Sequence, residues 1–456
     1  MPEPHFSDLI FPHQEQPSMS QLMASLKRTT LTIHNRLNSI RADAEFVKSV
    51  SLAYAPRPLV ANERCGSWYI PPARKTASAY FKSTDGHERA WKFSTRRLNL
   101  HLVNLIEKND GIIIVDSTRR GKRMPDALSS TIPIWCTVLN LTLLPSHPSS
   151  SNLYLPPHLP ATTHAQISAL IPEFVASLKA LNLDLPTCLT KPLRPVWVTP
   201  DSSLPAEDDG PASIFDDFRP VICCTASRRV VGSEMDEGGY IQGAADDTEM
   251  WAHGLAAPLF WAYVDELVKA SEADLPGLIS HLVMEHDTGK KEEGPRIQLT
   301  PNISVCALPL AAASNPAECR IAITQDTTPK DSWIQSKSYM QVGLGKSKTA
   351  SRNLRVALPE ICTFASTFLS SLTEPGEGRI IIACKSGRDL SVGVALTISC
   401  YLFDDEGNFR TPAADVSFTK TLVKSRLGFI MTTYPEANPS RSTLQSVNSF
   451  LMDWRK

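Results

Sequence analysis

The sequence predicts an α/β protein built from two domains, and three observations support this prediction. The chain has 456 residues, which is long for a single hydrophobic core. Short apolar runs that lead into polar loops, in 111–123, 219–227 and 379–391, are typical of buried strands. Segments with helical spacing of apolar residues lie between these runs, and alternating strands and helices indicate an α/β fold in both halves.

The first half of the chain contains most of the predicted helices. Residues 1–20 are rich in proline and polar residues, and we expect them to be loose. The spacing of apolar residues predicts one or two helices in 21–50. Further helices are expected in 161–184, broken at Pro172, and in 247–270, again interrupted by a proline, because proline in a helix interior removes a hydrogen bond.

The second half begins after a charged, glycine-containing segment without apolar periodicity, 284–296, which we predict to be a linker. Short strands are expected at 303–310 and 320–325, followed by a helix at 358–372 and a strand, loop and helix around Cys384. A last helix is expected at 442–454, capped by Ser440 or Ser442. The predicted organisation is therefore a loose segment at 1–20, a first α/β domain at 21–283, a linker at 284–296 and a second α/β domain at 297–456.

Composition excludes several classes of protein. A hydrophobic content of 42% and a charged content of 20% are ordinary for a globular protein. No apolar run reaches the ~18–20 residues that cross a bilayer, and the N-terminus lacks the order of charges of a secretory signal. The ten cysteines form no CxxC pair and no zinc-ligand spacing. Reduced thiols are therefore expected in the cytoplasm, and a nuclear location is not excluded.

Charge is unevenly distributed along a chain whose net charge is −1. Residues 89–123 hold nine Lys and Arg against three acids, and residues 330–356 hold six against Asp331 alone. Residues 201–249 hold twelve acids and three arginines. Such segregation is expected when one face meets a polyanion, although either basic stretch taken alone is better read as solvated surface.

A loop of the Cys-x-x-Gly type follows the buried run at 380–384 and leads into a predicted helix. Backbone N–H groups of such a turn, at a helix N-terminus, form a nest for anions. The loop and the last helix resemble those of dual-specificity phosphatases, yet the arginine that these enzymes require six residues after the cysteine is Leu390 here. We therefore expect the loop to bind phosphate without cleaving it, while a merely structural role for Cys384 is equally compatible with the sequence. The candidate phosphate-binding residues are Cys384, Lys385, Ser386, Gly387, Arg388, Asp389, Leu390 and Ser391.

Three polar segments of the first half are further candidates: a polar turn at 82–87, the loop that follows the strand predicted at 111–116, and the acids at 246–249. The loop after 111–116 resembles the one with which phosphoribosyltransferases hold ribose 5-phosphate, although a basic surface turn is the commoner meaning of such a sequence. The segment 246–249 gathers acids suited to a divalent cation or to general-base chemistry, or to stabilising a helix N-terminus. The substrate-binding candidates are Lys82, Ser83, Thr84, Asp85, His87, Ser117, Thr118, Arg119, Arg120, Gly121 and Lys122, and the catalytic candidates are Asp116, Asp246, Asp247 and Glu249.

Six segments, taken together, closely resemble the initiator-tRNA 2'-O-ribosyl phosphate transferases of fungi and plants. They are 62–72, 80–87, 93–102, 113–136, 246–255 and 384–396. The resemblance implies transfer of a phosphoribosyl group from phosphoribosyl pyrophosphate to the 2'-hydroxyl of adenosine 64 in initiator methionine tRNA, a mark that keeps this tRNA out of elongation. For such a reaction we expect Mg²⁺, with Asp246 and Asp247 as possible ligands. We also expect contacts to tRNA from the basic stretches, for which the candidates are Arg96, Arg97, Arg123, Lys346, Lys348 and Arg352.

Two alternatives to the transferase are a cysteine-dependent phosphatase that uses Cys384 on protein or RNA, and a tRNA-binding module without catalytic activity. No obligatory protein partner and no membrane association are expected. For the transferase we expect an oxocarbenium-like transition state at C1, with a carboxylate that takes the proton of the 2'-hydroxyl. In a duplex this hydroxyl is reachable from the shallow minor groove.

Overall fold

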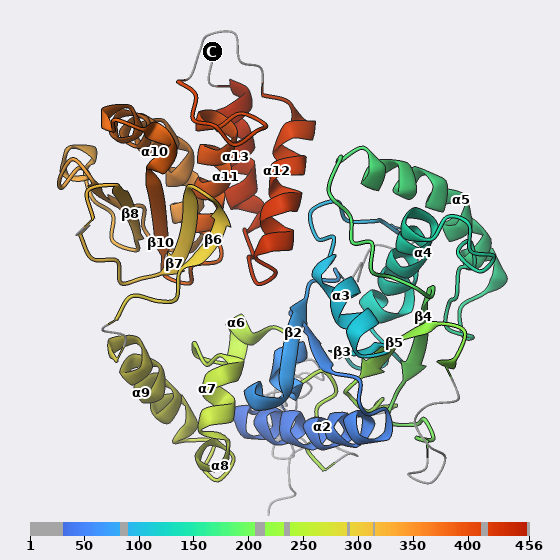
Figure 1. The fold of residues 1–456 in the computed structure, drawn as a ribbon. Coiled ribbons are helices and arrows are strands. Elements are labelled where there is room, and N and C mark those ends of the chain that lie inside the picture. The colour runs from blue at the N-terminus through green and yellow to red at the C-terminus, as the bar shows by residue number, and fades with distance from the viewer. Residues whose placement is uncertain are drawn as a thin grey trace, which may run out of the picture.

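The computed structural model describes residues 31–82, 90–205, 215–231, 238–289, 292–312, 315–411 and 418–453. It contains two separate five-stranded sheets, one in each half of the chain, and helices pack against both (Figure 1). The predicted α/β architecture is therefore confirmed.

The first sheet is entirely parallel. Its strand order is β2-β1-β3-β5-β4, with β1 (Leu59–Asn62), β2 (Lys75–Ala79), β3 (Ile112–Asp116), β4 (Leu193–Val198) and β5 (Arg219–Thr225). Strand β3 is buried along its whole length, which explains its continuous apolar sequence.

Alternate residues of β3 enter two different cores. Ile113 and Val115 pack with helix α2 (Ile33–Ala53) and with the helices α6 (Thr248–Trp251), α7 (Ala257–Ala262), α8 (Val264–Leu267) and α9 (Leu275–Thr288). Ile112 and Ile114 pack on the opposite face with α3 (His101–Lys108), α4 (Ile132–Leu143) and α5 (Ala161–Lys179). Helices on both faces leave the carboxyl edge of the sheet open for a site.

Helix α5 corrects one prediction. Pro172 does not break it, because α5 is continuous from Ala161 to Lys179. Ile167, Ile171 and Leu178 are buried against the first sheet's core, and this packing on both sides of the proline outweighs the missing hydrogen bond. Pro258, the one proline in 247–270, behaves as expected, since it lies in the first turn of α7 and short separate helices occupy that segment.

The second sheet has the strand order β6-β7-β10-β8-β9, in which only β6 is antiparallel to its neighbour. Its strands are β6 (Ile297–Thr300), β7 (Ile303–Ala307), β8 (Glu318–Thr324), β9 (Tyr339–Gly343) and β10 (Arg379–Cys384). Helices α10 (Ser347–Ser371), α11 (Leu390–Leu402), α12 (Lys420–Thr433) and α13 (Arg441–Asp453) pack into one core with it. Central strand β10 leads through the Cys-x-x-Gly loop into α11, as predicted.

Two helices extend into segments where no helix was expected. Helix α10 begins at Ser347 and continues through Pro359, so it starts eleven residues before the predicted helix. Helix α9 continues to Thr288, into the segment expected to be a linker. Ser440, one of the two predicted caps of α13, accepts a hydrogen bond from the Thr443 N–H at 3.1 Å.

The two halves of the chain are joined by hydrogen bonds as well as by the connecting segment. The Ser425 hydroxyl of α12 donates to the Leu181 carbonyl at 3.0 Å, and the Tyr80 hydroxyl donates to the Glu436 carbonyl at 3.1 Å. Among the helices in the described ranges, none combines the length and apolarity needed to cross a membrane.

Candidate functional site

The carboxyl ends of β1, β2, β3 and β5 meet at one edge of the first sheet, and Asp116 lies at its centre. Its side chain has no exposed surface. The Asn62 amide and the Ser117 N–H each donate to its carboxylate at 2.8 Å, and the Cys65 thiol donates at 3.1 Å. Burial raises the pKa of Cys65 well above its ordinary value, so the thiol keeps the proton that it donates. The carboxylate of Asp116 is therefore already hydrogen-bonded by neighbouring groups of the protein.

Arg64 connects Asp116 to the acidic segment that begins at Asp246. Its guanidinium lies 3.3 Å from the Asp116 carboxylate and 2.8 Å from that of Asp246. Burial raises the pKa of Asp246 above its ordinary value, although Arg64 opposes the shift. Asp247 and Glu249 are exposed. Two of the four predicted catalytic residues thus share one arginine, and the other two face solvent.

The loop that follows β3 is fixed by a neighbouring segment. Gln242 accepts a hydrogen bond from the Gly121 N–H at 3.1 Å and donates to the Lys122 carbonyl at 2.7 Å. Gly243 approaches so closely that a Cβ there would lie 2.7 Å from the Thr118 carbonyl oxygen. Gln242 is a site residue that sequence reasoning missed, since nothing local distinguishes it from a surface glutamine.

The side chains of that loop divide into two groups. Ser117 and Thr118 are buried, whereas Arg119, Arg120 and Arg123 are exposed. Lys122 forms an ion pair with Asp126 at 3.2 Å. Substrate binding by this loop stays a prediction. The side chains of the loop that a substrate could reach are those of the arginines.

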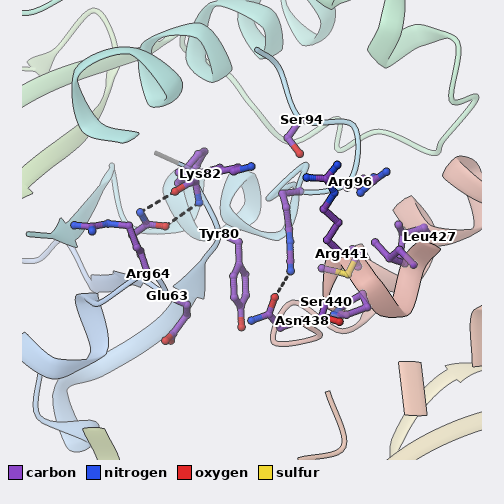
Figure 2. Close-up of a pocket in the computed structure, with 16 residues that line it drawn as sticks. Glu63, Arg64, Tyr80, Lys82, Ser94, Arg96, Leu427, Asn438, Ser440 and Arg441 are labelled. Atoms are coloured by element: carbon purple, nitrogen blue, oxygen red, sulfur yellow. Dashed lines mark hydrogen bonds between the residues drawn. The ribbon is translucent and has the colours of Figure 1, made fainter. Parts of the chain in front are cut away.

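A cleft of about 530 Å³ lies between the two domains, next to the carboxyl ends of β1 and β2 (Figure 2). We call it the interdomain cleft. The first domain lines it with Glu63, Arg64, Tyr80, Lys82, Ser94, Arg96 and Arg97, and the second with Leu427, Asn438, Ser440 and Arg441, among others. Three predicted binding residues, Lys82, Arg96 and Arg97, therefore meet there.

Arg97 holds the two walls of the interdomain cleft together. Its guanidinium stacks over the Tyr80 ring at 4.3 Å and donates to the Ala437 carbonyl at 2.7 Å. It also donates to the Asn438 side chain (Figure 2). Arg97, predicted to contact tRNA, is in this structure a bridge between the domains.

The phosphatase-like loop has the predicted turn. Gly387 has φ = +69°, and a Cβ there would lie 2.7 Å from the Cys306 carbonyl carbon, so only glycine fits. Cys384 is buried, with its sulfur 3.1 Å from the Ser391 hydroxyl. Leu390, at the position of the phosphatase arginine, packs against the core.

The same loop also supports the wall of the interdomain cleft. The Arg388 guanidinium pairs with Glu436, and the Arg388 carbonyl accepts from the Asn438 N–H at 2.7 Å. The Asp389 carboxylate accepts from the Ser440 N–H at 2.8 Å and from the Thr443 hydroxyl at 2.7 Å. Arg388 is thus turned toward segment 436–443 and away from the position that would replace the missing arginine.

The open side of the phosphatase-like loop faces a second cavity of about 560 Å³. Cys384, Lys385 and Ser386 line one side, and Pro258 and His286 of the first domain line another. The loop therefore has its own cavity, separate in its lining residues from the interdomain cleft.

The remaining predicted residues are dispersed. Ser83, Thr84, Asp85 and His87 lie outside the described residues. Lys346 and Arg352 are exposed near the start of α10, and Lys348 belongs to the first turn of that helix, with its side chain outside the description. Within the described ranges no group of three or more His, Cys, Asp or Glu side chains gathers as a metal site.

Comparisons with known proteins cover nearly the whole chain. Two family models match it, one described as the Rit1 N-terminal domain over residues 26–284 and one as the Rit1 DUSP-like domain over residues 338–451. The tRNA A64-2'-O-ribosylphosphate transferase of Saccharomyces cerevisiae is 34% identical over 493 residues, an alignment that covers 95% of each chain. An uncharacterized protein of Schizosaccharomyces pombe is 36% identical over 92% of this chain and 94% of its own.

Proposed function

The chain belongs to the Rit1 family, and from this premise we propose that it transfers a ribosyl phosphate group to the 2'-oxygen of adenosine 64 of tRNA. The observation that carries the proposal is the similarity to the S. cerevisiae transferase, which extends over 95% of both chains. We further propose initiator methionine tRNA as the acceptor, phosphoribosyl pyrophosphate as the donor, and exclusion of the modified tRNA from elongation as the result.

The reaction exchanges one bond at C1 of the donor ribose for another. The 2'-oxygen of the acceptor bonds to C1, the bond from C1 to the pyrophosphate oxygen breaks, and pyrophosphate leaves with the electron pair. The proton of the 2'-hydroxyl passes to a carboxylate. Asp116 is a poor candidate for this role because it is buried and its carboxylate already accepts three hydrogen bonds. The segment 246–249 is the better one, since its carboxylates reach solvent.

Arg64 positions the acidic segment in this scheme. It anchors Asp246 at 2.8 Å while its other contacts hold it to the end of β3. The acidic segment is therefore fixed relative to the carboxyl edge of the sheet, where α/β folds bind their ligands.

Magnesium is the cofactor that we propose, and Asp246 and Asp247 are the residues that would hold it. One or two carboxylates are enough when substrate phosphates complete the coordination. When bound, the ion would supply positive charge against the pyrophosphate. We propose the cytoplasm as the compartment, because all ten cysteines are free thiols.

The phosphatase alternative loses support from the geometry of the loop. Phosphoryl transfer requires a cation over the equatorial oxygens. Leu390 stands at the position of that cation, and Arg388 is paired with Glu436.

The transferase is tested by incubating the full chain with donor labelled in its ribose and with initiator tRNA. Label is expected on the tRNA, and it is expected to be absent from initiator tRNA in which adenosine 64 carries a 2'-O-methyl group. Unlabelled tRNA together with rapid hydrolysis of an aryl phosphate would overturn the proposal in favour of the phosphatase. Unlabelled tRNA that is nonetheless bound would favour the non-catalytic module.

A further inference from the structure

We propose that the interdomain cleft binds the diphosphate group of the small phosphorylated donor, and that Arg441 of the second domain is part of this site together with Lys82 and Arg96 of the first. The inference rests on the proposed function for the identity of the donor. It assigns a role to a residue, Arg441, that sequence reasoning left without one.

The interdomain cleft contains three cationic side chains. Lys82, Arg96 and Arg441 all line it, and within the described part of the chain none of the three has an ion-pair or hydrogen-bond partner for its side chain (Figure 2). Like charges gathered without counter-ions raise the free energy of the empty site, and a ligand with several negative charges lowers it again.

The nearest carboxylate does not neutralise these cations. Glu63 is the one acid among the lining residues that the structure describes. It accepts hydrogen bonds from Lys75 at 3.1 Å, from Ser67 at 2.8 Å and from Ser78 at 2.5 Å. Because its charge is already matched by Lys75, the interdomain cleft keeps an excess of positive charge.

The size and place of the cleft favour a small molecule over a nucleic acid duplex. A volume of about 530 Å³ lies within the range of small-molecule sites. The cleft also adjoins the carboxyl ends of β1 and β2, through Arg64 and Lys82.

The position of Arg441 is fixed by contacts to both domains. It is the first residue of α13, directly after Ser440, whose N–H donates to Asp389 of the phosphatase-like loop at 2.8 Å. The first domain holds the same segment through Arg97 and the Ala437 carbonyl at 2.7 Å. The phosphatase-like loop thus acts on the cleft through Asp389, which orients the helix that carries Arg441, and neither domain alone completes the site.

The test is calorimetric titration of inorganic pyrophosphate into the full chain. Arg441→Gln and Arg96→Gln are each expected to weaken pyrophosphate binding by roughly 10- to 200-fold, the usual effect of losing one charge-assisted contact. Arg379→Gln removes the same charge from the same domain as Arg441, but from the exposed first residue of β10, at the opposite end of the strand from the loop. This control is expected to bind pyrophosphate as the unaltered chain does.

Several results would overturn the inference. The first is that the unaltered chain does not bind pyrophosphate. The second is that Arg441→Gln and Arg96→Gln both bind it as the unaltered chain does, and the third is that Arg379→Gln loses as much affinity as they do. A parallel titration with tRNA gives the remaining outcome, since weakened tRNA binding with unchanged pyrophosphate binding would reassign the cleft to RNA. Failure of the proposed function is distinguishable, because a chain that transfers nothing to tRNA can still show Arg441-dependent binding of pyrophosphate.

Discussion

Replacing Asp116 with asparagine is expected to destabilise the first domain strongly, because the carboxylate is an anchor for four groups. Asn62, Cys65 and the Ser117 N–H donate to it, and Arg64 lies 3.3 Å away. Asparagine has the same shape but replaces one acceptor oxygen with an NH₂ donor and removes the negative charge.

The size of the expected loss of stability depends on the groups that surround the new NH₂ group. If the asparagine oxygen keeps the bonds to Ser117 and Cys65, its NH₂ faces the Asn62 amide, which donates at 2.8 Å in the unaltered protein. Asn62 cannot turn over, because its oxygen accepts from the Phe81 N–H at 2.8 Å and its nitrogen also donates to the Phe81 carbonyl at 3.0 Å. A buried unpaired donor costs about 1–3 kcal/mol and a lost charge-assisted bond about 1.5–3 kcal/mol. The free energy of unfolding is thus expected to fall by about 3–5 kcal/mol.

Urea unfolding followed by tryptophan fluorescence measures this loss. With an m value of about 2 kcal/mol/M, the midpoint of the first domain is expected to fall by about 1.5–2.5 M. Asp247→Asn is the matched control, since Asp247 is exposed at φ = +52°, a conformation that asparagine tolerates, and a change below about 0.5 kcal/mol is expected. Equal midpoints for the two variants would refute the anchoring role, and loss of transfer activity in an equally stable Asp116→Asn variant would indicate direct contact with substrate.

Cys384→Ser is expected to keep most transferase activity, because serine preserves the turn and its N–H groups; complete loss in a folded variant would indicate thiolate chemistry. Burial raises the pKa of Asp43 well above its ordinary value of 3.8, so its contribution to stability is present below that value and is lost as the pH rises through the raised pKa. Asp43→Asn, which retains an acceptor for the Tyr240 hydroxyl, is expected to flatten this decline in thermal unfolding between pH 4 and 8, and parallel curves for variant and wild type would contradict it. Charge reversal at Lys346 and Lys348 is expected to reduce the salt dependence of tRNA binding by roughly 0.7–0.9 in log–log slope per lost contact, and an unchanged slope would exclude contact there.

The central strands were predictable because the sequence itself records their burial. β3, β5 and β10 lie inside their sheets and are buried on both faces after their first residues, so each reads as a continuous apolar run. The outer strands β2 and β9 carry no such run, because one edge and part of one face meet solvent. The predicted break at Pro172 was wrong, because the local preference of proline to end a helix is outweighed by the packing of α5 on both sides of it.

The family and the missing phosphatase arginine were also legible in the sequence, because both reside in contiguous motifs such as 384–396. The direction in which each side chain points could not be predicted from the sequence. Asp116 was predicted to be a catalytic carboxylate, and the fold turns it inward onto Asn62 and Cys65. Arg388 looked like part of an anion loop, and the fold paired it with Glu436.

The interdomain cleft was decided by tertiary structure alone. Lys82 follows β2, Arg96 precedes α3, and Arg441 opens α13 near the end of the chain. Lys82 and Arg96 were predicted to bind different ligands and Arg441 to bind none, and no local pattern links the three. They meet because the two domains dock through Tyr80, Arg97 and the segment after α12, and docking depends on the shapes of two finished cores rather than on neighbouring residues in the chain.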